Sequence, residues 1–110
     1  MASNKKVVWQ PRATKELYEI LEFYNNRNGS AEYSERLASK MEYRLSLVGE
    51  NFQIGEKVDE KNVRRTVVEN YVIYYWITPD SVAVLSIRDA RRKPKRFKWE
   101  GENHGNNGMD

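Results

Sequence analysis

A cluster of basic residues follows the last predicted strand of this chain. Residues 82–88 have the composition of a β-strand, and they lead directly into residues 89–99, where cations are dense. Cations at the rim of a folded core suit a polyanion or an acidic partner chain. Aromatic residues and arginines mark binding surfaces, so we expect partner contact here rather than a merely solvated end. The residues assigned to this surface are Arg88, Arg91, Arg92, Lys93, Arg96, Phe97 and Trp99.

Composition limits the kinds of protein that the chain can be. Its 110 residues, 39% of them hydrophobic, fit one compact domain. The net charge is only +3 because acidic residues are plentiful in residues 16–60, so the basic character is concentrated in the second half. The chain has no cysteine, which excludes disulfides, thiolate nucleophiles and the usual zinc sites. We expect no metal and no cofactor, no membrane span and a cytoplasmic location.

The first half predicts a strand and two helices. Residues 6–9 form a short strand, and Pro11 suits the first turn of a helix. Its predicted buried stripe is Ala13, Leu17, Ile20, Leu21 and Tyr24, with Lys15, Glu16, Glu19 and Glu22 facing solvent. Ser30 is the expected cap of a second helix, whose buried face is Tyr33, Leu37, Met41, Leu45 and Val48. The short connection predicts an antiparallel helical hairpin.

The second half predicts a loop and three strands. Residues 52–62 lack periodicity, and Phe52, Ile54 and Val58 are the expected contacts of this loop with the core. Residues 63–69, 71–77 and 82–88 are rich in β-branched and aromatic residues, and turn residues separate them. The predicted fold is α+β, of order β-α-α-β-β-β, with the hairpin packed on one face of a largely antiparallel four-stranded sheet. We expect one domain over residues 1–99 and a disordered tail over residues 100–110.

The order and spacing of these segments resemble the RelE/ParE superfamily of toxins from type II toxin–antitoxin operons, with the ParE-like branch closest. The resemblance covers roughly residues 6–97 and rests on Val8–Ala13 followed by Leu17 and Ile20, on Gly55, and on residues 62–68, 70–75 and 84–94. The ParE-like branch typically has His-Gly-Arg-Arg after its last strand, where this chain has Asp89, Ala90, Arg91 and Arg92. The histidine of that motif is therefore missing.

The resemblance implies a small toxin that a cognate antitoxin neutralises, and it leaves two targets open. ParE-like members poison DNA gyrase by protein contact, which is the favoured function here. RelE-like members enter the ribosome and cut messenger RNA. If the chain is such an endoribonuclease, Arg64, Arg65, Arg91 and Lys61 are its candidate catalytic residues, with Lys57 nearby in the loop. Under either function, Arg64 and Arg65 are also expected to bind target or antitoxin.

The RNase alternative lacks an evident general base. Cleavage needs a group that deprotonates the ribose 2′-hydroxyl, beside cations for the phosphate. The sole histidine, His104, lies in the predicted tail, where catalytic geometry is seldom held. A third interpretation is a non-toxic RNA-binding module, which gains support if Tyr74 and Trp76 are exposed. Arg64 and Arg65 have a plainer interpretation as strand residues that hold Glu69 or Asp59.

Overall fold

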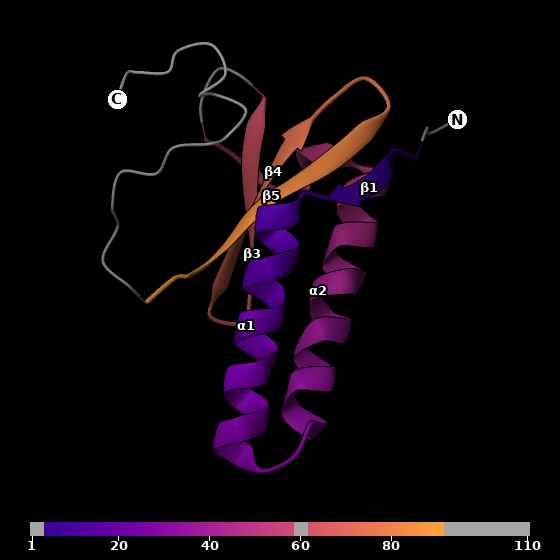
Figure 1. Cartoon of the computed structure of the whole chain (residues 1–110). Helices are drawn as coiled ribbons and strands as arrows, with labels where there is room; N and C mark the ends of the chain where they lie inside the picture. The colour runs from indigo at the N-terminus through magenta and orange to yellow at the C-terminus, as the bar shows by residue number, and fades with distance from the viewer. Residues whose placement is uncertain (1–3, 59–61, 92–110) are drawn as a thin grey trace.

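The computed structural model describes residues 4–58 and 62–91, which form two helices packed on one face of a five-stranded sheet (Figure 1). The predicted α+β class is confirmed, as is the helical hairpin on one face of the sheet. The elements in chain order are β1 (Lys6–Trp9), α1 (Pro11–Asn28), α2 (Glu32–Glu50), the 3₁₀ turn η1 (Phe52–Ile54), β2 (Glu56–Lys57), β3 (Val63–Val68), β4 (Tyr71–Ile77) and β5 (Ser81–Asp89).

The sheet has the order β1-β5-β4-β3-β2. Strand β1 lies parallel to β5, and every other pair is antiparallel. The predicted meander of three strands is confirmed to within about a residue at each end. The fifth strand is the two-residue β2, which lies in the segment predicted as a loop and pairs with Arg64 and Arg65. Two residues without alternating hydrophobicity carry no strand signal, so sequence alone could not predict β2.

Both helices begin close to the predicted residues. Pro11 occupies the first turn of α1, where its missing N–H leaves no hydrogen bond unmade. Gly29 ends α1 in the left-handed region with φ 71°, and its amide donates to the carbonyl of Asn25 at 2.9 Å. The expected cap of α2 is shifted by one residue. Ala31 is the N-cap, and Ser30 Oγ accepts only a long bond, 3.4 Å, from the amide of Glu32.

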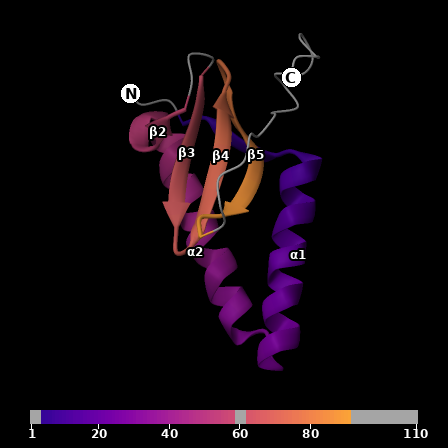
Figure 2. The same ribbon diagram turned by 90° about the vertical axis from the view of Figure 1, so that its left-hand side faces the viewer.

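The main core lies between the helices and the sheet. The predicted stripe of α2 is confirmed, since Leu37, Met41 and Leu45 are buried in this core and Tyr33 packs against it. Ala13 of α1 is fully buried with them. The strands contribute Val68, Tyr71, Ile73, Val84 and Ile87. The helices therefore bury the alternate residues of the strands that point toward them, and they leave the other face of the sheet without a covering helix (Figure 2).

Tyr75 holds the segment after α2 in place. Its hydroxyl accepts a hydrogen bond from the amide of Gly55 at 2.9 Å and donates one to the carbonyl of Phe52 at 2.9 Å. Of the three expected loop contacts, Phe52 packs against the core. Ile54 and Val58 are exposed, so those two predictions are wrong. A buried tyrosine hydroxyl satisfies the backbone here, and Phe52 supplies the apolar contact of the segment with the core.

Glu16 faces the sheet rather than solvent. The helical period predicts an outward side chain, but its Oε1 accepts hydrogen bonds from Ser86 Oγ at 2.8 Å and from the amide of Ile87 at 2.9 Å. Strand β1 pairs with β5 only as far as Val84, so no strand of the described residues lies beside Ile87 on this edge. The carboxylate supplies the acceptor that a neighbouring strand would otherwise provide.

Candidate functional site

A cleft of about 480 Å³ opens between α1 and the last residues of β5. Aromatic, acidic, basic and apolar side chains all contribute to its walls, and we call it the α1–β5 cleft. Its lining residues are Glu16, Glu19, Ile20, Phe23, Tyr24, Arg27, Tyr71, Ile87, Arg88, Asp89 and Arg91. Mixed walls of this kind suit another protein chain better than a small apolar molecule.

The helix contributes one continuous face to this cleft. Glu16, Ile20, Phe23, Tyr24 and Arg27 recur at spacings of three or four residues, which brings them to one side of α1. Beyond the end of β1, the neighbour of β5 is this helix face rather than a strand. The cleft therefore exists because β1 is short and β5 is long.

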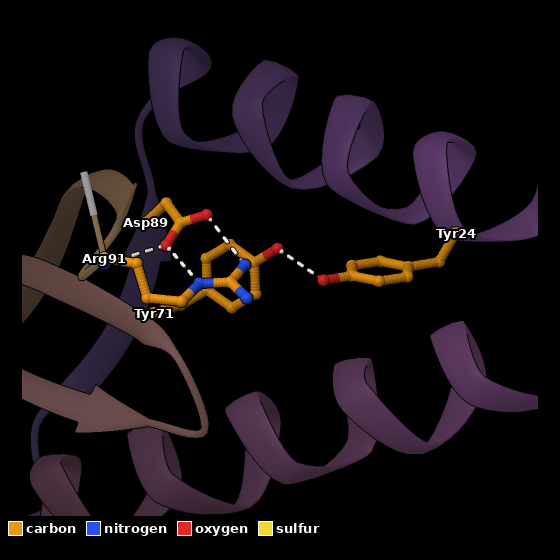
Figure 3. Close-up of polar contacts among 4 residues, drawn as sticks. All are labelled: Tyr24, Tyr71, Asp89 and Arg91. Atoms are coloured by element: carbon orange, nitrogen blue, oxygen red, sulfur yellow. Dashed lines mark hydrogen bonds and ion pairs between the residues drawn. The ribbon is translucent and has the colours of Figure 1, made fainter. Parts of the chain in front are cut away.

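Two polar pairs lie in the wall of the cleft (Figure 3). Tyr24 of α1 and Tyr71 of β4 face one another with their hydroxyl oxygens 3.1 Å apart. Arg91 donates to Asp89 through Nε to Oδ1 at 3.0 Å and through Nη2 to Oδ2 at 2.9 Å. This bidentate geometry fixes the guanidinium in the plane of the carboxylate. The Arg91 side chain is still 59% exposed, so it is oriented and open to a partner.

Tyr71 and Arg91 are both protonated at neutral pH, so they can donate hydrogen bonds to a partner but cannot act as general bases. Burial raises the pKa of Tyr71, and the hydrogen bond with Tyr24 raises it further. Its hydroxyl therefore stays protonated at neutral pH. Hydrogen bonding to Asp89 raises the pKa of Arg91, which stays charged. The cleft can thus offer hydroxyl donors and a cation to an acidic partner, but Tyr71 cannot serve as a base.

The two arginines of β3 lie on opposite faces of the sheet. Arg64 points to the helix side, where Nη1 donates to the carbonyl of Gly55 at 2.8 Å and its guanidinium lies 5.9 Å from the Phe52 ring centroid. Arg65 points to the other side and donates through Nε to Glu56 at 3.1 Å. This bond is the main reason that the pKa of Arg65 is raised, and a hydrogen bond with Tyr74 adds to it. The partner of Arg65 is therefore Glu56, while Glu69 pairs with Lys40 at 2.6 Å.

The structure brings some predicted site residues together and separates others. Arg88 and Arg91 both line the α1–β5 cleft. Arg64 pairs with Tyr75, whereas Asp89 pairs with Tyr71, four residues away on β4. At about 3.3 Å per residue, Arg64 lies roughly 13 Å from the Asp89–Arg91 pair along the strand direction. Lys57 is exposed on β2. Lys61, Arg92, Lys93, Arg96, Phe97, Trp99 and His104 lie outside the described residues.

Sequence reasoning missed Tyr24, Tyr71, Asp89 and Glu16 as members of the site. Periodicity assigns Tyr24 to the buried stripe of its helix. Both tyrosines do pack at the core, and both also line the cleft. Asp89 was regarded only as a replacement for a histidine. Its position two residues before Arg91 is the one local indication of a role, because this spacing permits the observed bidentate ion pair with Arg91.

Tyr74 and Trp76 share the face of the sheet away from the helices. By register, Trp76 lies opposite Ala83 and Tyr74 opposite Ser86. Trp76 is 38% exposed, and Tyr74 is partly buried against Val63. The condition set for an RNA-binding module is thus met by Trp76 and only in part by Tyr74.

Two further features bear on metal binding and membranes. Within residues 4–58 and 62–91, no three histidine, cysteine or carboxylate side chains gather closely enough to hold a metal ion. In the same part of the chain, no helix is long and apolar enough to cross a bilayer.

Comparison with known proteins identifies a family over most of the chain. A family model described as the ParE toxin of the type II toxin–antitoxin system parDE matches residues 7–94. A solved structure of a chromosomal ParDE system from P. aeruginosa superposes with a TM-score of 0.69 at 14% identity, covering 79% of this chain and 97% of that one. At this identity the superposition establishes the shared fold alone. A search of curated proteins finds no match.

Proposed function

This chain belongs to the family of ParE toxins of type II toxin–antitoxin systems, and we propose that it arrests growth by binding a target protein, with DNA gyrase as the first candidate. A cognate antitoxin is its expected partner, and we place both in the cytoplasm. The toxin domain comprises residues 1–99 in this proposal. The family match lies within that range.

The separation of the candidate catalytic residues supports binding over RNA cleavage. Cleavage needs a base and several cations around one phosphate. Arg64 and Arg65 face opposite sides of the sheet, and Arg91 lies at the other end of the strands. These three described candidates therefore do not surround one phosphate-sized site.

The protonation states support the same conclusion. Tyr71, the buried tyrosine at the cleft, has a raised pKa and remains protonated near neutral pH. Arg91 is charged and already forms an ion pair with Asp89. These groups can recognise an acidic or hydrogen-bonding partner, but neither accepts a proton from a ribose hydroxyl.

We assign the antitoxin to the α1–β5 cleft. Ile20, Phe23 and Ile87 supply apolar wall, and Phe23 is 54% exposed. Arg27 and Arg91 add cations beside them. An antitoxin segment with apolar side chains and flanking carboxylates fits this combination.

Charge reversal tests the assignment. Arg91→Glu together with Arg92→Glu should weaken antitoxin binding at least about tenfold, because the reversed charges repel an acidic antitoxin segment. Arg36→Glu is the matched control, since Arg36 is an exposed arginine of α2 remote from the cleft lining. The antitoxin affinity of each purified variant is measured by calorimetry, and rescue of induced cultures by co-expressed antitoxin is followed by viable counts. Wild-type antitoxin affinity in the double variant would show that the site is misplaced.

The endoribonuclease alternative predicts a different dependence. Replacing Lys57 and Lys61 together with alanine should reduce toxicity only if RNA is cut, because a protein contact at the cleft does not use them. Unchanged arrest in this variant therefore counts against the RNase. Loss of arrest, accompanied by new messenger-RNA ends, would replace the proposed function.

A further inference from the structure

A row of apolar side chains crosses the face of the sheet that neither α1 nor α2 covers. Register places Val8 opposite Ala83, Ala83 opposite Trp76, and Trp76 opposite Val63, so the row spans β1, β5, β4 and β3. Figure 2 shows the sheet in front of α2, with β3, β4 and β5 nearest the viewer. We call this surface the helix-free face.

Val8 and Trp76 of this row are accessible to a partner, whereas Val63 and Ala83 are buried. Val8 and Trp76 are each 38% exposed, and Val67, further along β3, is 52% exposed. Large apolar side chains that gather on one surface usually mark an interaction site, whereas scattered ones do not. The α1–β5 cleft does not include any of these three residues. The apolar row is therefore separate from the cleft. Two edge residues of the face are shared with other surfaces, since Arg88 also lines the α1–β5 cleft and Val67 also lines a groove beside α2.

Charge argues against a second copy of the chain as the occupant. By alternation and register, Lys6, Arg65 and Arg88 lie on the same face as the apolar row, with Glu56 as a carboxylate among them. In a symmetric face-to-face dimer, this basic rim would lie against itself. An apolar surface rimmed by carboxylates would instead meet opposite charges.

The side chains also favour a protein over a nucleic acid. Single-stranded RNA platforms present two or three exposed rings for base stacking. Here Trp76 is the exposed ring, while Tyr74 packs against Val63 and Leu85 and bonds to Arg65. The other large exposed members of the face, Val8 and Val67, are aliphatic. Aliphatic area is suited to a dry protein contact.

We propose that the helix-free face is a second docking surface, which binds a protein with an apolar patch rimmed by acidic residues. This inference rests on the proposed function. It assigns the helix-free face to the target protein whose binding arrests growth, and the α1–β5 cleft to the antitoxin. The two contacts then use opposite sides of the sheet. Variants of the helix-free face should separate toxicity from antitoxin binding.

Val67→Glu and Trp76→Glu test this separation. Each places a carboxylate among the apolar side chains of the helix-free face, where it opposes both burial and an acidic rim. Each variant is expected to require at least about tenfold more toxin for the same growth arrest. Its affinity for the antitoxin encoded beside the toxin gene should remain within about twofold of wild type, measured by calorimetry on the purified chains. Tyr18→Glu is the matched control, because Tyr18 is 65% exposed on α1 and lies outside the cleft lining.

Each outcome of this experiment is decisive. Wild-type arrest by both variants overturns the second surface and leaves the proposed function intact. If arrest and antitoxin affinity are lost together, with unchanged thermal melting, the antitoxin binds the helix-free face. This result also overturns the proposal of a second surface for the target. If the wild-type chain binds a single-stranded RNA 20-mer and Trp76→Glu abolishes this binding, the occupant of the face is a nucleic acid, which overturns the proposal.

If the wild-type chain itself does not arrest growth, the proposed function is wrong. If either glutamate variant melts early, Val67→Thr, which keeps the β-branched shape, replaces it and should show a smaller loss of arrest.

Discussion

Two tyrosines of β4, four residues apart on the same face of the sheet, have different roles. Tyr75 is fully buried, and its hydroxyl bonds to backbone atoms of Phe52 and Gly55. Tyr71 is also buried, but its hydroxyl meets Tyr24 at the wall of the α1–β5 cleft. One end of the strand is closed by the segment after α2, and the other is open because β1 is short. The same residue type therefore serves structure at one end and, in the proposed function, recognition at the other.

Gly55→Ala should have the largest effect, at the closed end. A Cβ there would lie 2.5 Å from the carbonyl oxygen of Arg65 and would also meet the Tyr75 hydroxyl, so backbone must move. We expect a loss of about 3 kcal/mol in the free energy of unfolding, measured by urea denaturation. Gly29→Ala is the control. It has free space but φ 71°, so it should lose only about 1 kcal/mol. Equal losses would show that crowding by Tyr75 and Arg65 is not the cause.

Removing one hydroxyl at a time compares the two ends directly. Tyr75→Phe leaves the buried amide of Gly55 without its acceptor, and we expect it to cost about 2 kcal/mol. Tyr71→Phe should cost less than about 1 kcal/mol, because water in the cleft can replace the lost partner of Tyr24. Antitoxin affinity should fall for Tyr71→Phe and stay constant for Tyr75→Phe. The reverse order of stabilities would contradict this comparison.

Glu16 supports the open end, and its removal should have a smaller effect than that of the Tyr75 hydroxyl. Glu16→Ala deprives Ser86 and the edge amide of Ile87 of their acceptor, so a loss of about 1.5 kcal/mol is expected. Glu16→Gln keeps an amide oxygen and should lose less. Thermal melting compares the two variants, and identical melting temperatures would mean that the edge bond contributes nothing measurable.

The smallest effect is expected at alkaline pH. Burial raises the pKa of Tyr71 and of Tyr75 above the ordinary value of 10.0. Above about pH 10 the unfolded chain therefore binds fewer protons than the folded chain, and the free energy of unfolding falls as pH rises. Denaturation at several alkaline pH values should show a shallower fall in Tyr71→Phe and in Tyr75→Phe than in wild type. An unchanged slope in both variants would mean that neither pKa is raised by folding.

Most of the fold follows from local patterns in the sequence. The stripe of α2, Pro11 at the start of α1 and the alternation in β3 to β5 each reflect a period that burial imposes on the chain. The misplaced details have a common origin. The segment around Ile54 is held by hydrogen bonds from Tyr75, and Glu16 is held by hydrogen bonds from Ser86 and Ile87 of β5. The amide of Val58 bonds to the carbonyl of Val63. Periodicity does not report contacts over such sequence separations.

The candidate site could be predicted only in part. Arg88 and Arg91 were expected at a binding surface from the density of cations, and both line the cleft. Alternation sends Arg64 and Arg65 to opposite faces of the sheet, so at most one of them can share a site with Arg91. The Tyr24–Tyr71 contact joins residues 47 positions apart, so local spacing in the sequence could not predict it.

Supercoiling by purified DNA gyrase, in the presence of the purified toxin, tests the central claim most directly. Growth arrest through protein binding predicts that the toxin inhibits supercoiling or traps cleavage complexes, and that antitoxin added first prevents this. A translation reaction containing the same toxin should keep its messenger RNA intact. Unimpaired gyrase, together with new messenger-RNA 5′ ends that appear only with ribosomes, would contradict the account and identify an endoribonuclease.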